Sequence, residues 1–399
     1  MNKIKKYDII IVGAGAAGLG AASELANSDL KVLLVDKKGE YHDLCVPHYF
    51  VKKMGLEAAI IKKFSFYSFY SEKYKLVREL GEKHIFAFIN PQAAKRIILK
   101  RVKFDVLNDT EIIDAEYGHH SICLTDCRKR KYDGKIVIDC SGTSAVVATN
   151  LELNLQYSVC FFCYMAVLNS CDISRPQELS FNVDEKYSNG AAWVYPYDRK
   201  KAQVGVADIL PYRISTKENL RTRLIRLIRK STPYKEWFSN SRIDKGSIFV
   251  KIYPLSTVKS MVGDNLIIAG DSAGHTLPYI GEGFRPSMIM GIEAAKIAKK
   301  ALEKGDLSKR GLIEFEKIWR EHFGKYRFWA VLARYLGIHY NNRKREVSLR
   351  RMKNLTDDEF FNYVQSKYTL KLLCKIIGID LLFKCVSRFE LRFPFKNSK

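Results

Sequence analysis

The sequence predicts an α/β fold, α+β overall, with a Rossmann-like nucleotide-binding domain, an antiparallel-sheet substrate domain and a helical C-terminal region. Three stretches predict it. Residues 7–36 have the pattern of a strand, a glycine turn, a helix and a second strand, and residues 157–210 alternate with the period of two that is typical of antiparallel strands. Residues 264–302 have the pattern of a strand followed by a long helix. We expect a discontinuous nucleotide-binding domain and two further regions, with the boundaries 1–156 and 250–303, 157–249, and 304–399.

The first stretch places a glycine-rich turn between the apolar strand Ile9–Val12 and a helix of small residues, 16–25. Its glycines follow the pattern G-x-G-x-x-G at Gly13, Gly15 and Gly18. The first glycine permits the tight turn, the second lets a pyrophosphate approach the backbone, and the third lets the helix pack closely on the sheet. This pattern therefore predicts a phosphate-binding turn.

The helix after this turn begins with Ala16 and Ala17, whose backbone N–H groups and positive dipole end can bind a pyrophosphate. A second apolar strand, Val32–Val35, leads to Asp36, about 20 residues beyond the glycines, where a carboxylate can accept hydrogen bonds from a ribose. We therefore expect a bound adenine dinucleotide. The alternative is a glycine turn that only connects a strand to a helix.

Two later strands also end in small residues. Ile136–Ile138 leads to Gly142, which suits the close approach of a nucleotide, and Leu266–Ala269 leads to Asp271. A carboxylate at the end of a strand, beside a glycine-flanked helix start, can hold a polyol chain. The helix start, which would face a flavin ring or a phosphate, comprises Gly281, Glu282, Gly283 and Phe284.

The local pattern by itself assigns no functional role to several other residues. Trp193 lies in a predicted strand and by itself suggests ordinary sheet core, and Cys45 by itself suggests a small buried residue. Cys160 and Cys163 form C-x-x-C without a second pair, and positions three apart in a strand face opposite sides. We therefore expect no metal site.

Composition restricts the classes of partner. The chain has 67 Lys and Arg against 43 Asp and Glu, a net charge of +24, which favours anionic lipid surfaces, nucleic acid or acidic proteins, or else only a solvated basic surface. Its nine cysteines are an odd number, and we expect reduced thiols and a cytoplasmic location. No apolar run reaches the roughly 18 residues that span a bilayer.

Basic amphipathic helices are predicted late in the chain. A capping box at Ser215 and Glu218 is expected to open one of them. Another, within residues 370–386, is apolar but interrupted by charges. It either closes the substrate pocket or lies in a membrane interface as a peripheral contact.

Taken together and in this order, the three motifs resemble those of the geranylgeranyl reductase family, in a flavoprotein group that includes aromatic hydroxylases. The resemblance covers about residues 1–320. The family's Y-x-W-x-F-P motif and its following glycine correspond to residues 191–196 and Gly205, with Ala191 in place of tyrosine and Tyr195 in place of phenylalanine. The family's G-D-A-A/S-G…P…G-E/G-G-I segment corresponds to Gly270, Asp271, Ala273, Gly274, Pro278, Gly281 and Gly283.

The family's cysteine after the second strand corresponds to Cys45, so the resemblance implies a catalytic role for this thiol. It implies FAD as the cofactor and a substrate site at Trp193, Tyr195 and Pro196. One feature differs: where the family often has Asp-Arg, this chain has Asn90-Pro91.

The resemblance implies hydrogenation of isolated double bonds in a prenyl, geranylgeranyl-type lipid, with Cys45 or a nearby water as the candidate proton donor. The electron donor is not indicated, because no separate NAD(P)H-binding motif is visible. One alternative is an FAD-dependent monooxygenase or halogenase-like enzyme acting on an aromatic or polyketide substrate, although the halogenase W-x-W-x-I-P motif is only partly matched. A second is an RNA-binding flavoprotein whose affinity would fall steeply with salt, but no RNA-binding module is visible and we do not expect nucleic acid as a partner.

Overall fold

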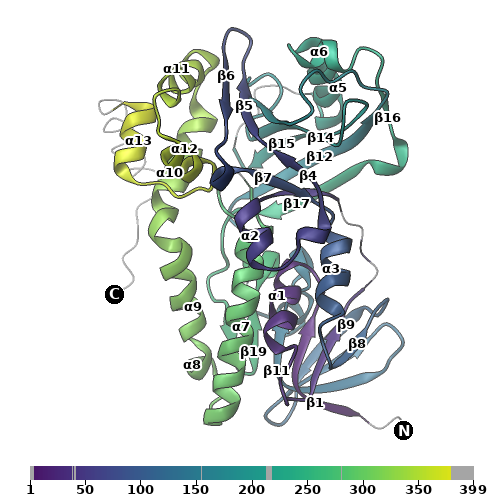
Figure 1. Cartoon of the computed structure of the whole chain (residues 1–399). Helices are drawn as coiled ribbons and strands as arrows, with labels where there is room; N and C mark the ends of the chain where they lie inside the picture. The colour runs from purple at the N-terminus through teal and green to yellow at the C-terminus, as the bar shows by residue number, and fades with distance from the viewer. Residues whose placement is uncertain are drawn as a thin grey trace.

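The computed structural model describes residues 4–37, 39, 42–153, 155–212, 218–279 and 281–378. Two large sheets lie at opposite ends of the molecule, and helices α8 to α13 run along one side of both (Figure 1). The predicted fold class is confirmed, with a parallel Rossmann-like sheet, a mostly antiparallel second sheet and a helical C-terminal region.

The first sheet has the strand order β18-β19-β11-β1-β2-β8, and β9 and β10 extend β11 as antiparallel neighbours. The pairs β1–β2, β1–β11, β2–β8 and β11–β19 are parallel. Its central strands are buried on both faces, which explains their continuous apolar runs. The strands are β1 (Lys5–Val12), β2 (Val32–Val35), β8 (Asp105–Leu107), β9 (Ile112–Tyr117), β10 (Ile122–Asp126), β11 (Lys131–Asp139), β18 (Val262–Gly263) and β19 (Leu266–Ile268).

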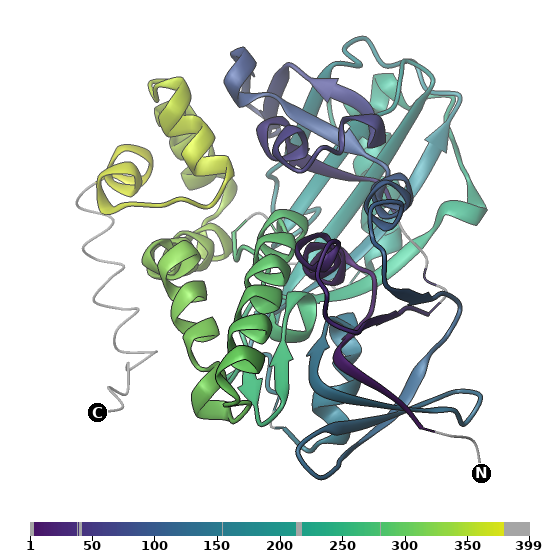
Figure 2. The same ribbon diagram turned by 60° about the horizontal axis from the view of Figure 1, so that its bottom comes forward.

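Two helices distant in sequence, α1 (Ala16–Leu25) and α7 (Phe284–Lys304), lie side by side over this sheet (Figure 2). They approach backbone to backbone. A Cβ at Gly20 would collide with the carbonyl of Met288, and a Cβ at Gly291 would collide with the carbonyl of Ala17. The small residues of α1, which were predicted to suit close packing on the sheet, therefore also admit a second helix.

The second sheet has the order β16-β12-β15-β14-β13-β5-β6, with β17 on the other side of β12. All its pairs are antiparallel except β5–β13. Its strands are β5 (Phe66–Tyr70), β6 (Lys75–Glu79), β12 (Cys160–Asn169), β13 (Glu178–Asn182), β14 (Ala191–Pro196), β15 (Lys201–Leu210), β16 (Arg242–Ile243) and β17 (Phe249–Pro254).

The expected range 157–249 for the substrate domain stays a prediction, but strands from outside it join its sheet. β5 and β6 come from the first part of the chain, and most of β17 follows residue 249. A small sheet, β3-β7-β4, accompanies them. Its strands and the short elements of this part of the chain are β3 (Leu44–Pro47), α2 (His48–Lys53), η1 (Glu57–Ala59), β4 (Ile60–Phe64), η2 (Glu82–His84), β7 (Phe86–Ile89), α3 (Pro91–Leu99), η3 (Gly142–Ser144) and α4 (Val146–Asn150).

Two helix boundaries differ from expectation. α3 was expected over residues 92–103 but ends at Leu99, where the chain turns and Arg101 donates a hydrogen bond to the carbonyl of Gly55 (2.7 Å). α5 begins at Leu220, and the side chain of Asn219 caps it by accepting a hydrogen bond from the N–H of Thr222 (2.9 Å). Ser215 of the expected capping box lies outside the described residues.

The C-terminal helices α10 to α13 pack against β5, β6 and β13 through an aromatic core that includes Tyr67, Phe69 and Phe360. Among the described residues, no helix is both long and apolar enough to cross a membrane. Of the segment 370–386, the structure describes α13 and Gly378, and the rest lies outside the described residues. The remaining helices are α5 (Leu220–Lys230), α6 (Tyr234–Trp237), η4 (Lys245–Ser247), η5 (Gly270–Ala273), α8 (Lys309–Leu312), α9 (Glu314–Trp319), η6 (Arg320–Gly324), α10 (Lys325–His339), α11 (Asn342–Met352), α12 (Asp357–Val364) and α13 (Leu370–Ile377).

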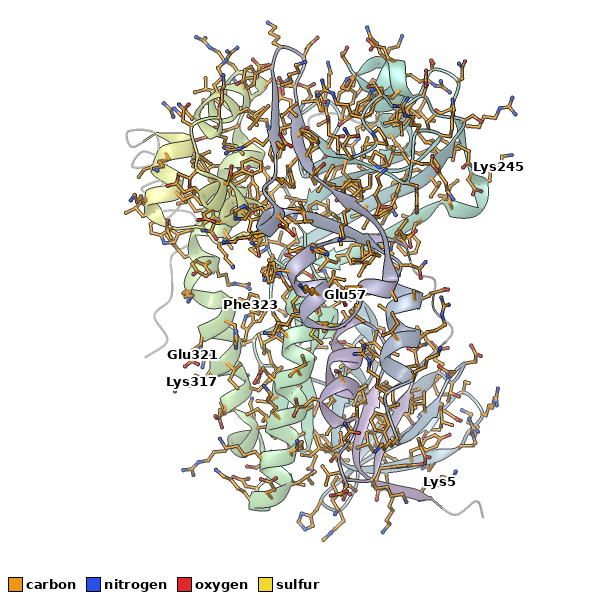
Figure 3. The ribbon with its side chains drawn as sticks, viewed as in Figure 1. Lys5, Glu57, Lys245, Lys317, Glu321 and Phe323 are labelled. Carbon is orange, nitrogen blue, oxygen red and sulfur yellow. The ribbon has the colours of Figure 1, made fainter. Side chains whose placement is uncertain are left out.

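Charged side chains are spread over the surface. Lys5 and Lys245 lie at opposite ends of the molecule, and Lys317 and Glu321 project outward from the C-terminal side (Figure 3). The last two form an exposed ion pair at 3.8 Å, which contributes little to stability. The basic excess is therefore not confined to one end of the molecule.

The contact between α1 and α7 generates a prediction about stability. Gly291→Ala should lower the free energy of unfolding by about 1–3 kcal/mol, because the new methyl group has to displace the Ala17 carbonyl. Chemical denaturation measures this. The control is Gly337→Ala in α10, where an added Cβ meets no heavy atom within 4 Å and better helix propensity should add up to about 1 kcal/mol. Equal effects of the two substitutions would contradict the proposed packing role.

Candidate active site

A cavity of about 370 Å³ lies between the carboxyl ends of the first sheet's strands and the second sheet. Most of the residues that the sequence predicted for cofactor, substrate or catalysis line this one cavity. They are Gly15, Ala16, Ala17, Cys45, Gly142, Trp193, Tyr195, Asp271, Gly281, Glu282, Gly283 and Phe284. Residues from opposite ends of the sequence therefore meet around one space.

The three glycines of the turn have two different structural roles. Gly13 has φ +99°, and a Cβ there would collide with the carbonyl of Cys140; a Cβ at Gly18 would collide with the carbonyl of Gly13. Gly15 is different, because an added Cβ would meet nothing within 4 Å, and this residue faces the cavity. Gly13 and Gly18 thus shape the turn, whereas Gly15 leaves room for a ligand.

Asp36 lies just behind the turn. Its carboxylate accepts a hydrogen bond from the N–H of Ala14 (2.7 Å) and forms an ion pair with Lys95 of α3. The side chain is almost buried, and Asp36 is not among the described residues that line the cavity. Its carboxylate thus fixes the turn, and Lys95 lies close to the predicted ribose site.

Gly142 follows β11 and faces the cavity in a left-handed conformation with φ +79°. An added Cβ would meet nothing within 4 Å. The hydroxyl of Ser272 donates a hydrogen bond to the Gly142 carbonyl (2.9 Å), which joins η3 to η5. This contact holds the ends of β11 and β19 together at the rim of the cavity.

Asp271 and the start of α7 form the next wall. The hydroxyl of Thr276 donates to the Asp271 carboxylate at 3.3 Å, and burial raises the pKa of this carboxyl group. α7 begins at Phe284 without a side-chain cap, so its first N–H groups and positive dipole end are available to a ligand.

Next to this helix start, Glu282 and Arg285 form a buried pair with two hydrogen bonds, from Nε to Oε1 at 2.9 Å and from a terminal guanidinium nitrogen to Oε2 at 2.8 Å. Burial opposes the charge of Arg285, but the Glu282 carboxylate outweighs it and raises the pKa of the guanidinium. Because both charges are neutralised by each other, the pair fixes the helix start without adding net charge to the cavity.

Cys45 lies in β3, opposite Phe88 of β7, and its thiol lines the cavity near Tyr195. Burial raises the pKa of this thiol well above its usual value, and the nearby Glu282 carboxylate adds to the effect. The thiol is therefore protonated at neutral pH. Although its local pattern alone suggested packing, the structure places Cys45 in the same cavity as the glycine turn.

Trp193 and Gly205 lie directly opposite each other in the β14–β15 pair. A Cβ at Gly205 would collide with the indole ring, so this glycine lets Trp193 lie flat across β15 and reach the cavity. Tyr195, two residues on, faces the same cavity. Pro196 ends β14 and is not among the described lining residues.

Sequence reasoning missed several residues of the cavity wall. His42 packs against Phe249 with the two rings tilted and their centroids 4.6 Å apart, and burial lowers the pKa of His42 to about 4, with Lys251 contributing. Asp43 accepts hydrogen bonds from the hydroxyl of Tyr197 (2.5 Å) and the side chain of Asn90 (3.1 Å). His42 and Asp43 come from the irregular segment after β2, for which periodicity gives no orientation.

Periodicity in β17 gives the wrong orientation. In an ordinary half-buried strand the apolar Val250 and Ile252 would face inward. In the structure they are 51% and 49% exposed, whereas Lys251 and Tyr253 line the cavity. The orientation of this strand is therefore set by its partners in the sheet and not by its apolar pattern.

The position of the half-buried Cys45 in the cavity wall leads to a prediction about its reactivity. Because its pKa is raised, iodoacetamide should label Cys45 much more slowly than the exposed Cys127 between about pH 7 and 9. Peptide mass spectrometry after timed labelling measures both sites in one sample. Equal labelling rates would contradict the protonated, protected thiol.

The chain is similar in sequence to one family model and to several reductases. The family model described as pyridine nucleotide-disulphide oxidoreductase matches residues 7–171, the part of the chain with the glycine turn. Digeranylgeranylglycerophospholipid reductase 2 of Methanococcoides burtonii is 24% identical over 414 residues, which cover 98% of this chain and 99% of the relative. The digeranylgeranylglycerophospholipid reductase of Methanosarcina acetivorans is 26% identical over 341 residues, 80% of this chain and 81% of the relative.

Solved structures agree on the fold. A geranylgeranyl bacteriochlorophyll reductase-like protein from Thermoplasma acidophilum superposes with a TM-score of 0.73 at 18% identity, covering 98% of both chains. The flavin-dependent brominase Bmp2 gives the same TM-score, 0.73, at 15% identity, covering 98% of this chain and all of the brominase. The similarity to geranylgeranyl reductases that the motifs suggest is thereby confirmed over most of the chain, and its fold is that of FAD-dependent oxidoreductases.

Proposed function

We propose that this chain binds FAD in the 370 Å³ cavity and hydrogenates double bonds of a prenyl lipid there. One observation carries the proposal: a thiol that stays protonated, Cys45, shares an aromatic cavity with an open glycine turn and an uncapped helix start. The relatives named for reduction of digeranylgeranylglycerophospholipids, at 22–26% identity, point to the same class of substrate.

Open backbone positions and polar groups of the cavity support FAD as the ligand. Gly15 and Gly142 have no protein atom in the space that a side chain would fill, which suits a ligand close to the backbone. We assign the pyrophosphate to the turn at 13–18 and the N-terminus of α1. The ribose would lie near Asp36, whose carboxylate is already bonded to the N–H of Ala14 and to Lys95, so Lys95 is the side chain of this pair that lies closer to the ribose. We assign the polyol chain to Asp271 and the flavin ring to the start of α7, at Gly281, Glu282, Gly283 and Phe284.

The rest of the cavity suits an apolar chain. Its walls include the aromatic side chains of Tyr67, Phe161, Phe181, Trp193 and Tyr195. Burial raises the pKa of Tyr195 and of Tyr67 well above the usual value, so both hydroxyls stay neutral. A neutral, aromatic wall binds an isoprenoid by apolar contact and excludes water from the reacting bond.

The protein's part in the reaction is alignment, exclusion of water and supply of a proton. Reduced FAD, when bound, supplies a hydride equivalent to one carbon of the double bond. The other carbon needs a proton, and the S–H group of Cys45 holds one at neutral pH. Its raised pKa also means that the thiolate left after transfer regains a proton from solvent, so that each cycle consumes one hydride and one proton.

Hydrogenation generates the first prediction of this proposal. The holoprotein, reduced without oxygen and offered a digeranylgeranyl phospholipid, should yield products heavier by two hydrogens per step in mass spectrometry. Cys45→Ala should slow this reaction by roughly 10²–10⁴-fold, the usual contribution of a positioned acid, and should retain the flavin. Cys127→Ala, at an exposed position, is the control.

Two outcomes would count against this function. Unchanged turnover in Cys45→Ala would remove the thiol from the mechanism. Oxygen-dependent reoxidation coupled to hydroxylation or halogenation of an aromatic compound, with no lipid product, would favour the monooxygenase or halogenase-like alternative.

The glycine turn generates a second prediction. Gly15→Ala should weaken FAD binding by about tenfold or more, because its methyl group would occupy space that we assign to the pyrophosphate. The melting temperature of the apoprotein should not change, since the methyl group meets no protein atom. Gly18→Ala should instead lower that melting temperature, and an unchanged FAD affinity in Gly15→Ala would refute the assignment.

A further inference from the structure

A second cavity, of about 150 Å³, adjoins the first, because Tyr67, Phe181 and Ala191 line both. It lies between the second sheet and the C-terminal helices. Much of its wall is apolar, and this part includes Phe69, Leu336, Leu349, Met352, Ile376 and Ile377. By itself this wall would suit only a hydrocarbon chain.

Two arginines make this cavity unusual. Arg334 of α10 is only 4% exposed. One of its terminal guanidinium nitrogens donates a hydrogen bond to the carbonyl of Pro278 (3.5 Å), and the Nε atom of Arg334 has no hydrogen-bond partner. Arg345 of α11 donates from Nε to the Tyr340 carbonyl (3.0 Å) and from a terminal nitrogen to the Val183 carbonyl (2.6 Å). Neither guanidinium forms an ion pair with a carboxylate in the described part of the chain.

The surrounding charges do not neutralise them. Burial lowers the pKa of Arg345, and the carboxylates of Glu185 and Asp184 offset this only in part. Burial also lowers the pKa of Arg334, and its compensating neighbour is the hydroxyl of Tyr212.

A third guanidinium lies on the same helix as Arg334, although it is not among the described residues that line this cavity. Arg327 lies seven positions before Arg334 in α10, on the same helix face. Burial, together with the charge of Arg334, lowers its pKa to about 10. A buried or half-buried guanidinium whose charge is only partly compensated is costly, and an anion that binds between Arg334 and Arg345 would recover part of that cost.

We propose that the second cavity binds the anionic headgroup of an amphiphile, with Arg334 and Arg345 contacting a phosphate-type group. The apolar chain of this amphiphile would pass Tyr67, Phe181 and Ala191 into the first cavity. Guanidinium groups suit this task, because their planar fork binds phosphate oxygens in pairs. The inference rests on the proposed function for its prenyl chain, and it adds the residues that select the headgroup.

A binding experiment without turnover tests the inference. The holoprotein with oxidised flavin is titrated with geranylgeranyl phosphate, with geranylgeraniol and with inorganic phosphate, and calorimetry gives each dissociation constant. We expect the lipid phosphate to bind at least about tenfold more tightly than the alcohol, as for a charge-assisted pair of hydrogen bonds. Inorganic phosphate should compete with the lipid phosphate and not with the alcohol.

Variants assign this preference to the two side chains. Arg345→Gln and Arg334→Gln should each reduce the preference for the phosphate by about tenfold, while alcohol binding stays the same. Arg345→Lys keeps the charge but not the fork and should lose part of the preference. Arg343→Gln is the matched control, because it removes the same charge from an exposed position of the same helix.

Several results would overturn the inference. Equal binding of phosphate and alcohol by the wild type would do so without any variant, as would an unchanged preference in both Gln variants. A preference lost equally in Arg343→Gln would point to general surface charge instead. The experiment also separates this inference from the proposed function. Phosphate-selective binding without hydrogenation would refute the proposed reaction. Hydrogenation of geranylgeranyl phosphate and geranylgeraniol with equal KM would refute only the headgroup site.

Discussion

The contact between α1 and α7 is the constraint on which the site depends. The two helices approach through Gly20 and Gly291, where no side chain separates the backbones, and a Cβ at Gly270 would lie only 2.8 Å from the Cβ of Ala17. Each helix begins at the cavity, so this packing brings the turn at 13–18 and the helix start at 281–284 to the same space. Larger side chains at these positions would move apart the two pieces of chain that we assign to one cofactor.

In the first cavity, one pair of opposite charges lies beside the start of α7, and the reactive group is neutral. Glu282 and Arg285 neutralise each other, and the Cys45 thiol keeps its proton because it is buried beside the Glu282 carboxylate. Such an environment suits an apolar substrate and a proton donor better than it suits a reactive thiolate nucleophile. The adjoining second cavity differs, because its buried arginines are bonded to carbonyl groups and not to carboxylates. On our proposal, the two cavities would hold the apolar and the anionic part of one amphiphile.

Asn90 and Pro91, which stand where the family often has Asp-Arg, have structural roles of their own. Where the family often has Asp-Arg, Asn90 caps α3 by accepting a hydrogen bond from the N–H of Ala93 (2.8 Å) and donates one to Asp43. Pro91 lines the cavity as the first residue of that helix, so no cation reaches it from this position. The nearest basic residue of α3 with a role at the site is Lys95, which pairs with Asp36.

The sequence by itself determined the elements whose signals are local. The glycine turn, α1, β2, β19 and the long helix α7 follow from residue spacing, glycine geometry and apolar runs, and each lies close to where it was expected. Only the tertiary structure decided which sheet a strand joins and which side chains face a cavity. β5 and β6 join a sheet whose other strands follow almost a hundred residues later, and Cys45, His42, Arg334 and Arg345 reach their cavities through such long-range packing. Side-chain period and turn chemistry depend on neighbours in the chain, whereas burial and charge pairing depend on neighbours in space.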